Sequence, residues 1–300
     1  MQEREGLIGV PGGKVWYRLL GEGASGNPLL VLHGGPGGTH DYVEPVAALA
    51  DERPVVFYDQ LGSGRSDRPQ DDTLWTLERF VEELAQVRST LELSHVHLLG
   101  QSWGGMLAVE YMLRGSPDGV ISLVLSGPCL NAQRWAADQR RYLEHMPADI
   151  RETIAACEAT GDFTSPAYQA AMDAFYRCHL CRLDPWPDCL NRTFEKMGAD
   201  VYTQLWGPSE FTVLGSLREY DRTNDLKDIN IPTLFTCGRY DEATPEATQE
   251  YHRNLPGSEI AIFEDASHEH HLERTQDYLD VVRGFLRRVE DQDKSLLKKS

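Results

Sequence analysis

The sequence lacks an excess of positive charge. It holds 29 Lys and Arg residues against 47 Asp and Glu residues, which gives a formal net charge of −18. A protein that binds nucleic acid needs a basic surface to meet the phosphates, so this composition argues against a nucleic-acid partner. The acidic surplus instead favours solubility and the attraction of cationic ligands.

Long apolar runs are also missing. No stretch approaches the roughly 18 consecutive apolar residues that a membrane-spanning helix requires. The first residues, Met1 to Glu5, lack the basic and then apolar pattern of a signal peptide. We therefore expect no membrane association and a cytoplasmic location.

Cysteine is sparse and poorly spaced for a metal. The chain has 6 cysteines, and Cys178, Cys181 and Cys189 come close enough in sequence to suggest zinc. A zinc site would want a fourth ligand at suitable spacing, such as a second close pair, and the sequence offers none. In a reducing compartment we expect free thiols. We also expect no bound metal and no cofactor.

What the sequence does have is an alternation of short apolar runs and helical patterns. Strands are expected at 14–20, 29–33, 54–59, 96–100, 120–126, 231–237 and 259–263, and helices at 77–91, 103–113, 245–253 and 272–289. This alternation predicts an α/β fold, with a mostly parallel sheet covered by helices on both faces. Residues 127–228 interrupt the series for too long to form a bare loop. We therefore expect a core domain of 1–126 and 229–300 with a helical cap, 127–228, inserted in it.

A candidate nucleophile lies where one expected strand meets a helix. Gly100-Gln101-Ser102-Trp103-Gly104 matches G-x-S-x-G between the run HVHLLG and a helical pattern. In this context the serine occupies a tight turn that exposes its hydroxyl, and small residues two positions away let the backbone fold. The competing interpretation is a glycine-rich turn with an idle serine. We predict that Ser102 is the nucleophile.

The same turn offers donors for an oxyanion. The N–H of Trp103 follows the nucleophile and begins a helix, and a second donor is expected from the loop after an earlier strand. His33-Gly34-Gly35-Pro36-Gly37-Gly38 follows the run LLVLH and lets the backbone approach a ligand closely. We choose the N–H of Gly35 as the second donor.

The acid and the base are expected after the last two strands. Asp241 follows the strand at 231–237, and we favour it over its neighbour Glu242. His268 comes first in the loop after 259–263, and His271 is the alternative base. The three close histidines, His268, His270 and His271, match no standard metal spacing. We expect Asp241 to orient His268, which takes the serine proton.

Five segments together carry a family resemblance. They are HGGPGG (33–38), DQLGSGRS (59–66), GQSWGG (100–105), GPSEFT (207–212) and GRYDEATP (238–245). With these segments the chain resembles the proline iminopeptidases, especially the branch related to the tricorn-interacting aminopeptidase. The resemblance extends over about residues 6–288 and implies an α/β-hydrolase fold with a helical cap.

The resemblance also implies an activity and a way of holding the substrate. It implies release of an N-terminal residue, preferably proline, from short peptides through an acyl-enzyme, with Glu210 and Glu242 holding the free ammonium group. Phe211 and Trp103 are expected to line the apolar pocket for the first side chain. The alternatives are an amidase acting on amino-acid amides, an esterase with the same triad, and a non-catalytic binding protein. The sequence leaves the oligomeric state open.

Overall fold

The computed structural model describes residues 2–115 and 117–297, with side chains up to residue 292. Residues 1, 116 and 298–300, which fall within the predicted core ranges, lie outside the described residues. Within this part of the chain, no helix combines the length and the apolar character needed to cross a membrane.

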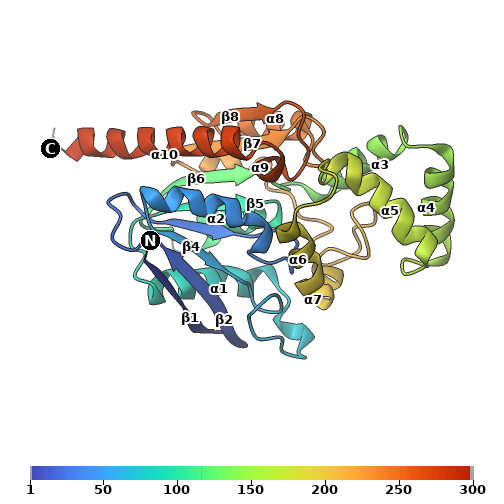
Figure 1. Ribbon diagram of the computed structural model, residues 1–300, viewed down its shortest axis with the longest axis horizontal. Coiled ribbons are helices and arrows are strands. Elements are labelled where there is room, and N and C mark those ends of the chain that lie inside the picture. The colour runs from blue at the N-terminus through green and yellow to red at the C-terminus, as the bar shows by residue number, and fades with distance from the viewer. Residues whose placement is uncertain (1, 116, 298–300) are drawn as a thin grey trace.

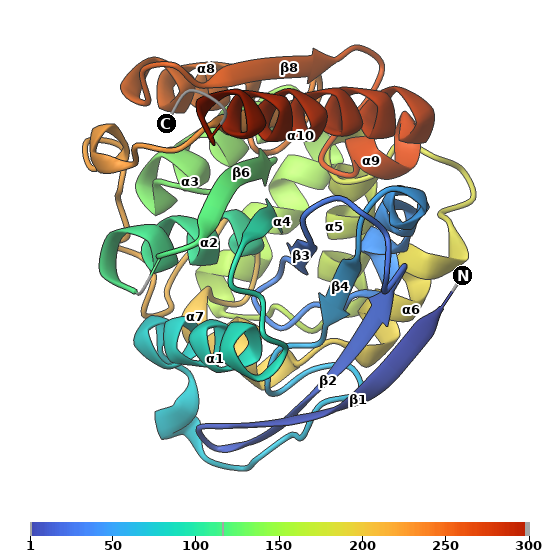
Figure 2. The same ribbon diagram turned by 90° about the vertical axis from the view of Figure 1, so that its left-hand side faces the viewer.

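A single sheet of 8 strands organises the core, in the order β1-β2-β4-β3-β5-β6-β7-β8. The strands are β1 (Glu3–Val10), β2 (Gly13–Leu20), β3 (Leu29–Leu32), β4 (Val55–Tyr58), β5 (Val96–Gln101), β6 (Val120–Ser126), β7 (Thr233–Gly238) and β8 (Glu259–Phe263). β1 and β2 are antiparallel to their neighbours, and the pairs from β4 onward are parallel. Figure 2 shows β1 and β8 at opposite edges of this sheet.

Helices cover both faces because the central strands are apolar on both sides. β3, written LLVL, and β4, written VVFY, are buried at every position. One apolar cluster joins the sheet to α1 (Leu77–Thr90), α2 (Trp103–Arg114) and α8 (Pro245–Asn254). A second cluster joins it to the 3-10 segment η1 (Asp41–Asp51) and to α10 (Thr275–Leu297). The predicted α/β-hydrolase fold is confirmed by this architecture.

The expectations and the structure differ at the two ends of the chain. β1, with the sequence EREGLIGV, is an edge strand that is mostly exposed and has only one buried residue, Ile8. It therefore carries no apolar alternation by which to predict it. The expected final helix is divided into α9 (His270–Glu273) and α10, with Arg274 between them.

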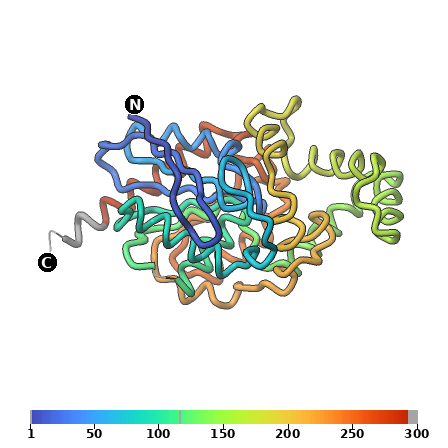
Figure 3. Tube along the Cα trace, turned by 90° about the horizontal axis from the view of Figure 1, so that it is seen from below, coloured from blue at the N-terminus to red at the C-terminus, as the bar shows by residue number. Residues whose placement is uncertain are grey.

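Five helices lie between β6 and β7 in the chain. They are α3 (Ala132–Leu143), α4 (Ala148–Thr160), α5 (Pro166–His179), α6 (Asp188–Lys196) and α7 (Ala199–Leu205). Figure 1 shows them at the end of the sheet toward which the β6 arrow points, and Figure 3 shows the yellow-green stretch of α4 and α5 projecting beyond the body. Because β3 and β5 to β8 run parallel, their carboxyl ends share this edge. We propose that residues 127–228 form a cap over it.

Candidate active site

Ser102 occupies a strained turn between β5 and α2. Its backbone angles are φ 53° and ψ −118°, in a region that side chains other than glycine rarely adopt. A Cβ atom at Gly104 would collide with the carbonyl oxygen of Leu32, and one at Gly100 would collide with that of Gly104. The two motif glycines are therefore required by the closeness of the backbone, and the turn brings Ser102 to the edge of a cavity.

His268 and Asp241 form a buried pair in the loops after β8 and β7. His268 Nδ1 lies 2.7 Å from Asp241 Oδ1, and both side chains are almost fully buried. Asp241 also accepts hydrogen bonds from the N–H groups of Ala243, at 2.7 Å, and Gly238, at 3.1 Å. Burial alone would raise the pKa of Asp241, but His268 and His270 lower it to about 2. Asp241 therefore stays ionised and orients the imidazole ring.

His270, the second histidine of the loop, contacts the Asp241 carboxylate oxygen that His268 leaves free. His270 Nδ1 lies 3.5 Å from Asp241 Oδ2, and His270 Nε2 lies 2.9 Å from the hydroxyls of both Ser126 and Thr236. His271 instead turns away, with Nε2 at 3.0 Å from the carbonyl oxygen of Tyr42. Of the three histidines in this loop, only His268 lines the cavity that Ser102 reaches.

The expected oxyanion donors, Gly35 and Trp103, lie beside Ser102. Gly35 has φ 118°, and a Cβ there would lie 2.5 Å from the backbone nitrogen of Gly38, so only glycine fits this bend. Trp103 begins α2, where the first N–H groups have no partner within the helix. Its indole ring is fixed below the turn by a 2.8 Å hydrogen bond from Nε1 to Gln60 Oε1. Gly35 and Trp103 border the narrow recess that also contains Ser102.

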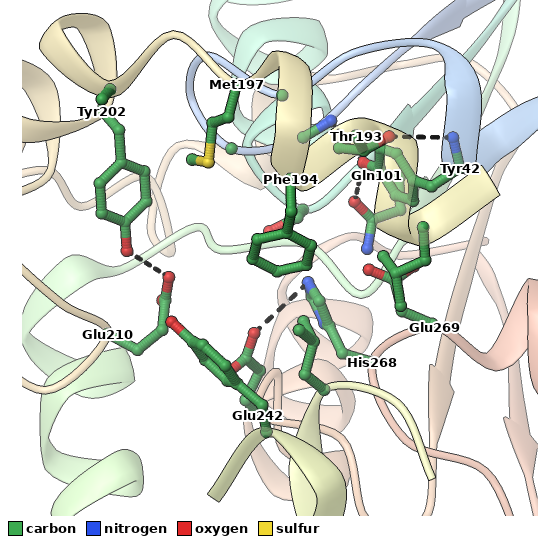
Figure 4. Close-up of a pocket in the computed structure, with 18 of the residues that line it drawn as sticks. Tyr42, Gln101, Thr193, Phe194, Met197, Tyr202, Glu210, Glu242, His268 and Glu269 are labelled. Carbon is green, nitrogen blue, oxygen red and sulfur yellow. Dashed lines mark hydrogen bonds and ion pairs between the residues drawn. The ribbon is translucent and has the colours of Figure 1, made fainter. Parts of the chain in front are cut away.

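The cavity has a volume of about 380 Å³ and lies between the turn and the proposed cap. Ser102 and His268 both line it, which brings the predicted nucleophile and base to one space. The cap contributes most of the apolar wall, through Tyr176, Leu180, Leu190, Phe194, Met197 and Tyr202. Figure 4 shows Phe194 next to the His268 ring, with Met197 and Tyr202 farther along the cavity.

Two carboxylates, buried Glu242 and partly buried Glu210, lie on one side of His268. Glu242 Oε1 lies 3.8 Å from His268 Nε2, and its Oε2 has no hydrogen-bond partner. Glu210 accepts a hydrogen bond from the Tyr202 hydroxyl (Figure 4). It accepts another, at 3.2 Å, from Trp135 Nε1. Burial and the neighbouring Glu210 raise the pKa of Glu242 well above its ordinary value, and burial also raises that of Glu210. Two acids at such close range in an apolar cavity form a strong attractor for a cation.

Phe211 does not reach this space. It lies in a separate apolar cluster of the proposed cap, with its ring centroid 4.6 Å from that of Phe175. The recess beside Ser102 is lined instead by Trp135 and Trp206, whose ring centroids are 6.0 Å apart. The expected pocket role of Phe211 is therefore corrected: Glu210 and Phe211 form the turn between the paired residues Ser209 and Thr212, and Phe211 is buried against Phe175 instead of lining the cavity.

The sequence offered no signal for Trp135, Trp206 or Tyr202, because each comes from a different part of the proposed cap. The cysteines form no metal cluster within the described residues, and the 6 thiols are free. One group with metal-ligand geometry, His40, Asp41 and Glu44, has its Asp41 carboxylate occupied by Lys196 at 2.8 Å.

The fold and these residues define a class of enzyme, the α/β-hydrolases, and a model of the α/β-hydrolase fold matches residues 27–275. A proline iminopeptidase from Heyndrickxia coagulans is 47% identical over 286 residues, covering 95% of this chain and 99% of that protein. The chain therefore belongs to the proline iminopeptidase family of α/β-hydrolases.

Two solved structures are similar to this chain over almost its whole length. The crystal structure of a proline iminopeptidase from Mycobacterium smegmatis superposes with a TM-score of 0.89 at 34% identity, covering 97% of this chain and 100% of that one. The crystal structure of VinJ superposes with a TM-score of 0.91 at 35% identity, covering 95% of this chain and 99% of that one. The predicted family is thus confirmed.

Proposed function

We propose that this protein is a serine aminopeptidase that releases an N-terminal residue, preferably proline, from short peptides. The observation that carries the proposal is the pair of acids, partly buried Glu210 and buried Glu242, beside His268 in a cavity that Ser102 lines. Relatives of this chain are named proline iminopeptidases. The alternative of an amidase or esterase has no comparable support. A cytoplasmic location stays a prediction.

The chemistry follows from the positions of the triad. Ser102 Oγ attacks the carbonyl carbon of the scissile bond while His268 Nε2 takes its proton. Asp241, 2.7 Å from His268 Nδ1, fixes the tautomer that leaves Nε2 free to act. The N–H groups of Gly35 and Trp103 stabilise the oxyanion. His268 then protonates the leaving amine, and water hydrolyses the acyl-enzyme.

The two acids explain why the enzyme would cleave only next to a free N-terminal amine. A free secondary ammonium can donate two hydrogen bonds, one to each of Glu210 and Glu242. The Tyr202 and Trp135 donors hold Glu210 in place, while Glu242 Oε2 has no partner inside the protein. A substrate blocked at the amine brings no charge to this pair and leaves it unpaired, so it is rejected.

The recess next to Ser102 is apolar and narrow, with a volume of about 10 Å³, which is room for about one water molecule. It is lined by Pro36, Met106, Cys129, Trp135 and Trp206, and Glu210 stands at its border. A pyrrolidine ring at the mouth of this recess, with its carbonyl carbon at Ser102, would have its nitrogen on the side of Glu210. A larger first side chain would meet the aromatic walls of Trp135 and Trp206, which supports the preference for proline.

A panel of aminoacyl-naphthylamides, free and N-acetylated, tests the proposal. We expect prolyl-naphthylamide to be the best substrate and acetyl-prolyl-naphthylamide to be inert. Ser102→Ala should lower turnover by about 10⁶ and abolish labelling by a fluorophosphonate. Comparable rates on the acetylated substrate would contradict the role of the acids, and activity surviving in Ser102→Ala would contradict the nucleophile. A prolyl dipeptide compared with prolinamide separates peptidase from amidase.

A further inference from the structure

A third buried acid lines the cavity and has no role in the triad or in the ammonium site. Glu269 directly follows His268 and is 3% exposed. Its backbone N–H donates to the carbonyl oxygen of Leu180 at 2.8 Å, which ties this loop to the end of α5. Glu269 lines the same cavity as Ser102.

No lysine or arginine side chain pairs with the carboxyl group of Glu269 among the described residues. Its Oε2 is buried without a hydrogen-bond partner, and the nearest basic atom, His271 Nε2, is 3.5 Å away. That nitrogen lies 3.0 Å from the carbonyl oxygen of Tyr42, to which it donates. Burial lowers the pKa of His271 to about 3, so the ring is neutral. Leaving a buried carboxyl group unpaired is costly, and a ligand that pairs with it recovers this free energy.

A second unpaired group lies nearby. Gln101 precedes the nucleophile, and its Oε1 accepts a hydrogen bond from the Tyr42 hydroxyl. Gln101 Nε2 is buried without a partner, although Gln101 lines the cavity. Figure 4 shows Gln101 and Glu269 on one side of His268, and Glu210 and Glu242 on the other. The cavity thus has an acid-lined end for the amine and a separate end with an unpaired donor and an unpaired acid.

The geometry of the reaction determines which part of a substrate lies near Gln101 and Glu269. If the amine lies between Glu210 and Glu242 and the carbonyl carbon lies at Ser102, the leaving nitrogen must face His268. The chain beyond that nitrogen then continues away from the ammonium site, toward Glu269. Leu180, Leu190 and Phe194 provide apolar surface there for the stem of a long side chain.

We propose that Glu269 forms a subsite for a cationic side chain, lysine or arginine, on the residue that follows the scissile bond. The inference rests on the proposed aminopeptidase function, because that function sets the direction of the substrate. Burial raises the pKa of Glu269 to about 8, and a cation beside it favours the ionised form. An acidic residue at the same substrate position is excluded by like charge.

The test compares Pro-Lys-amide with Pro-norleucine-amide, which have similar length but differ in charge, at about pH 8. Binding is measured by calorimetry on Ser102→Ala protein, and kcat/KM on protein with Ser102 intact. We expect about a tenfold preference for the lysine substrate in both measurements, falling to near one in Glu269→Gln. The matched control is Glu78→Gln, which removes one acid from the surface, where the side chain is 66% exposed, and should keep the preference. Pro-Glu-amide should be disfavoured by the unaltered enzyme.

Equal binding of the lysine and norleucine compounds would overturn the subsite, as would a lysine preference that survives in Glu269→Gln. Failure of the proposed function gives a different result. In that case prolyl-naphthylamide would not be hydrolysed, while the lysine preference in binding and its loss in Glu269→Gln would still support the cationic subsite.

Discussion

Replacing Glu242 with glutamine tests the ammonium site most directly. The change keeps the size of the side chain and removes one negative charge within 3.8 Å of His268 Nε2. Glu242 is buried and its Oε2 has no partner, so no other group of the protein takes over its role. Glu210 stays in place, held by Tyr202 and Trp135.

The size of the effect follows from the burial of the pair. A carboxylate and an ammonium at roughly 4 Å attract by about 4 kcal/mol at an effective dielectric constant near 20. Removing one partner of a buried ion pair typically costs about 3–5 kcal/mol. Because Glu210 retains part of the attraction, we expect a loss near the lower end, about 3 kcal/mol. This corresponds to a fall in kcat/KM of roughly 10²-fold.

The variant should also change the pH dependence. Burial lowers the pKa of His268, but Asp241, Glu242 and Glu269 outweigh it and raise the pKa to about 10. Removing the Glu242 carboxylate takes away one of the raising charges. The pKa of His268 therefore falls, and the acid limb of the kcat/KM profile moves to lower pH.

The assay follows kcat/KM for prolyl-naphthylamide from about pH 6 to about pH 11, a range that spans the His268 pKa of about 10, in the unaltered enzyme and in Glu242→Gln. Glu246→Gln, four residues along the chain with a side chain 61% exposed, is the matched control and should leave both rate and profile unchanged. A fall of less than threefold would refute the reasoning. So would an acid limb that moves to higher pH.

Two further predictions concern the scaffold. Gly127 has φ 53°, and a Cβ there would lie 3.0 Å from His268 Nδ1. Gly127→Ala should therefore lower kcat at least tenfold and cost about 1–2 kcal/mol of backbone strain, measured as a lower free energy of unfolding in urea. An unchanged kcat would contradict the tight packing of Gly127 against His268 and Asp241. Burial would raise the pKa of Glu290, but His97 and Arg53 lower it to about 2. The ionised Glu290 therefore stabilises the folded protein above the pKa that this residue has in the unfolded chain, and the stabilisation is lost as the pH falls toward 2. Glu290→Gln should therefore cost about 2 kcal/mol in the free energy of unfolding at pH 7, and the difference should narrow between about pH 5 and pH 3; a constant difference would refute the linkage.

Much of the core could be predicted because its signals are local. The runs that form β3 and β4 are apolar throughout, and β6 ends where the pattern ends, at Ser126. The turn at Ser102 could be predicted from Gly100 and Gly104, because the backbone leaves no room for a Cβ atom at either position. The acid and the base follow from the order of the parallel strands, because loops after their carboxyl ends meet at one edge.

The rest depends on contacts between distant segments. β1 is fixed by pairing with β2, from Glu3 opposite Leu20 to Val10 opposite Gly13, and its own residues show no alternation. Phe211 and Glu210 are neighbours in sequence, yet only Glu210 lines the cavity. Which of two adjacent residues faces inward is set by the packing of α5 against this segment, and no periodicity in GPSEFT reveals it.

The separation of the two ends of the cavity has a consequence for specificity. Glu210 comes from the proposed cap and Glu242 from the loop after β7, whereas Glu269 comes from the loop after β8. The amine end and the leaving-group end are therefore built by different segments on either side of His268. A substitution at position 269 changes the charge offered to the departing residue while the hydrogen bonds that hold Glu210 stay intact. The two ends are coupled only through charge, because Glu269 raises the pKa of Glu242 and both acids raise that of His268.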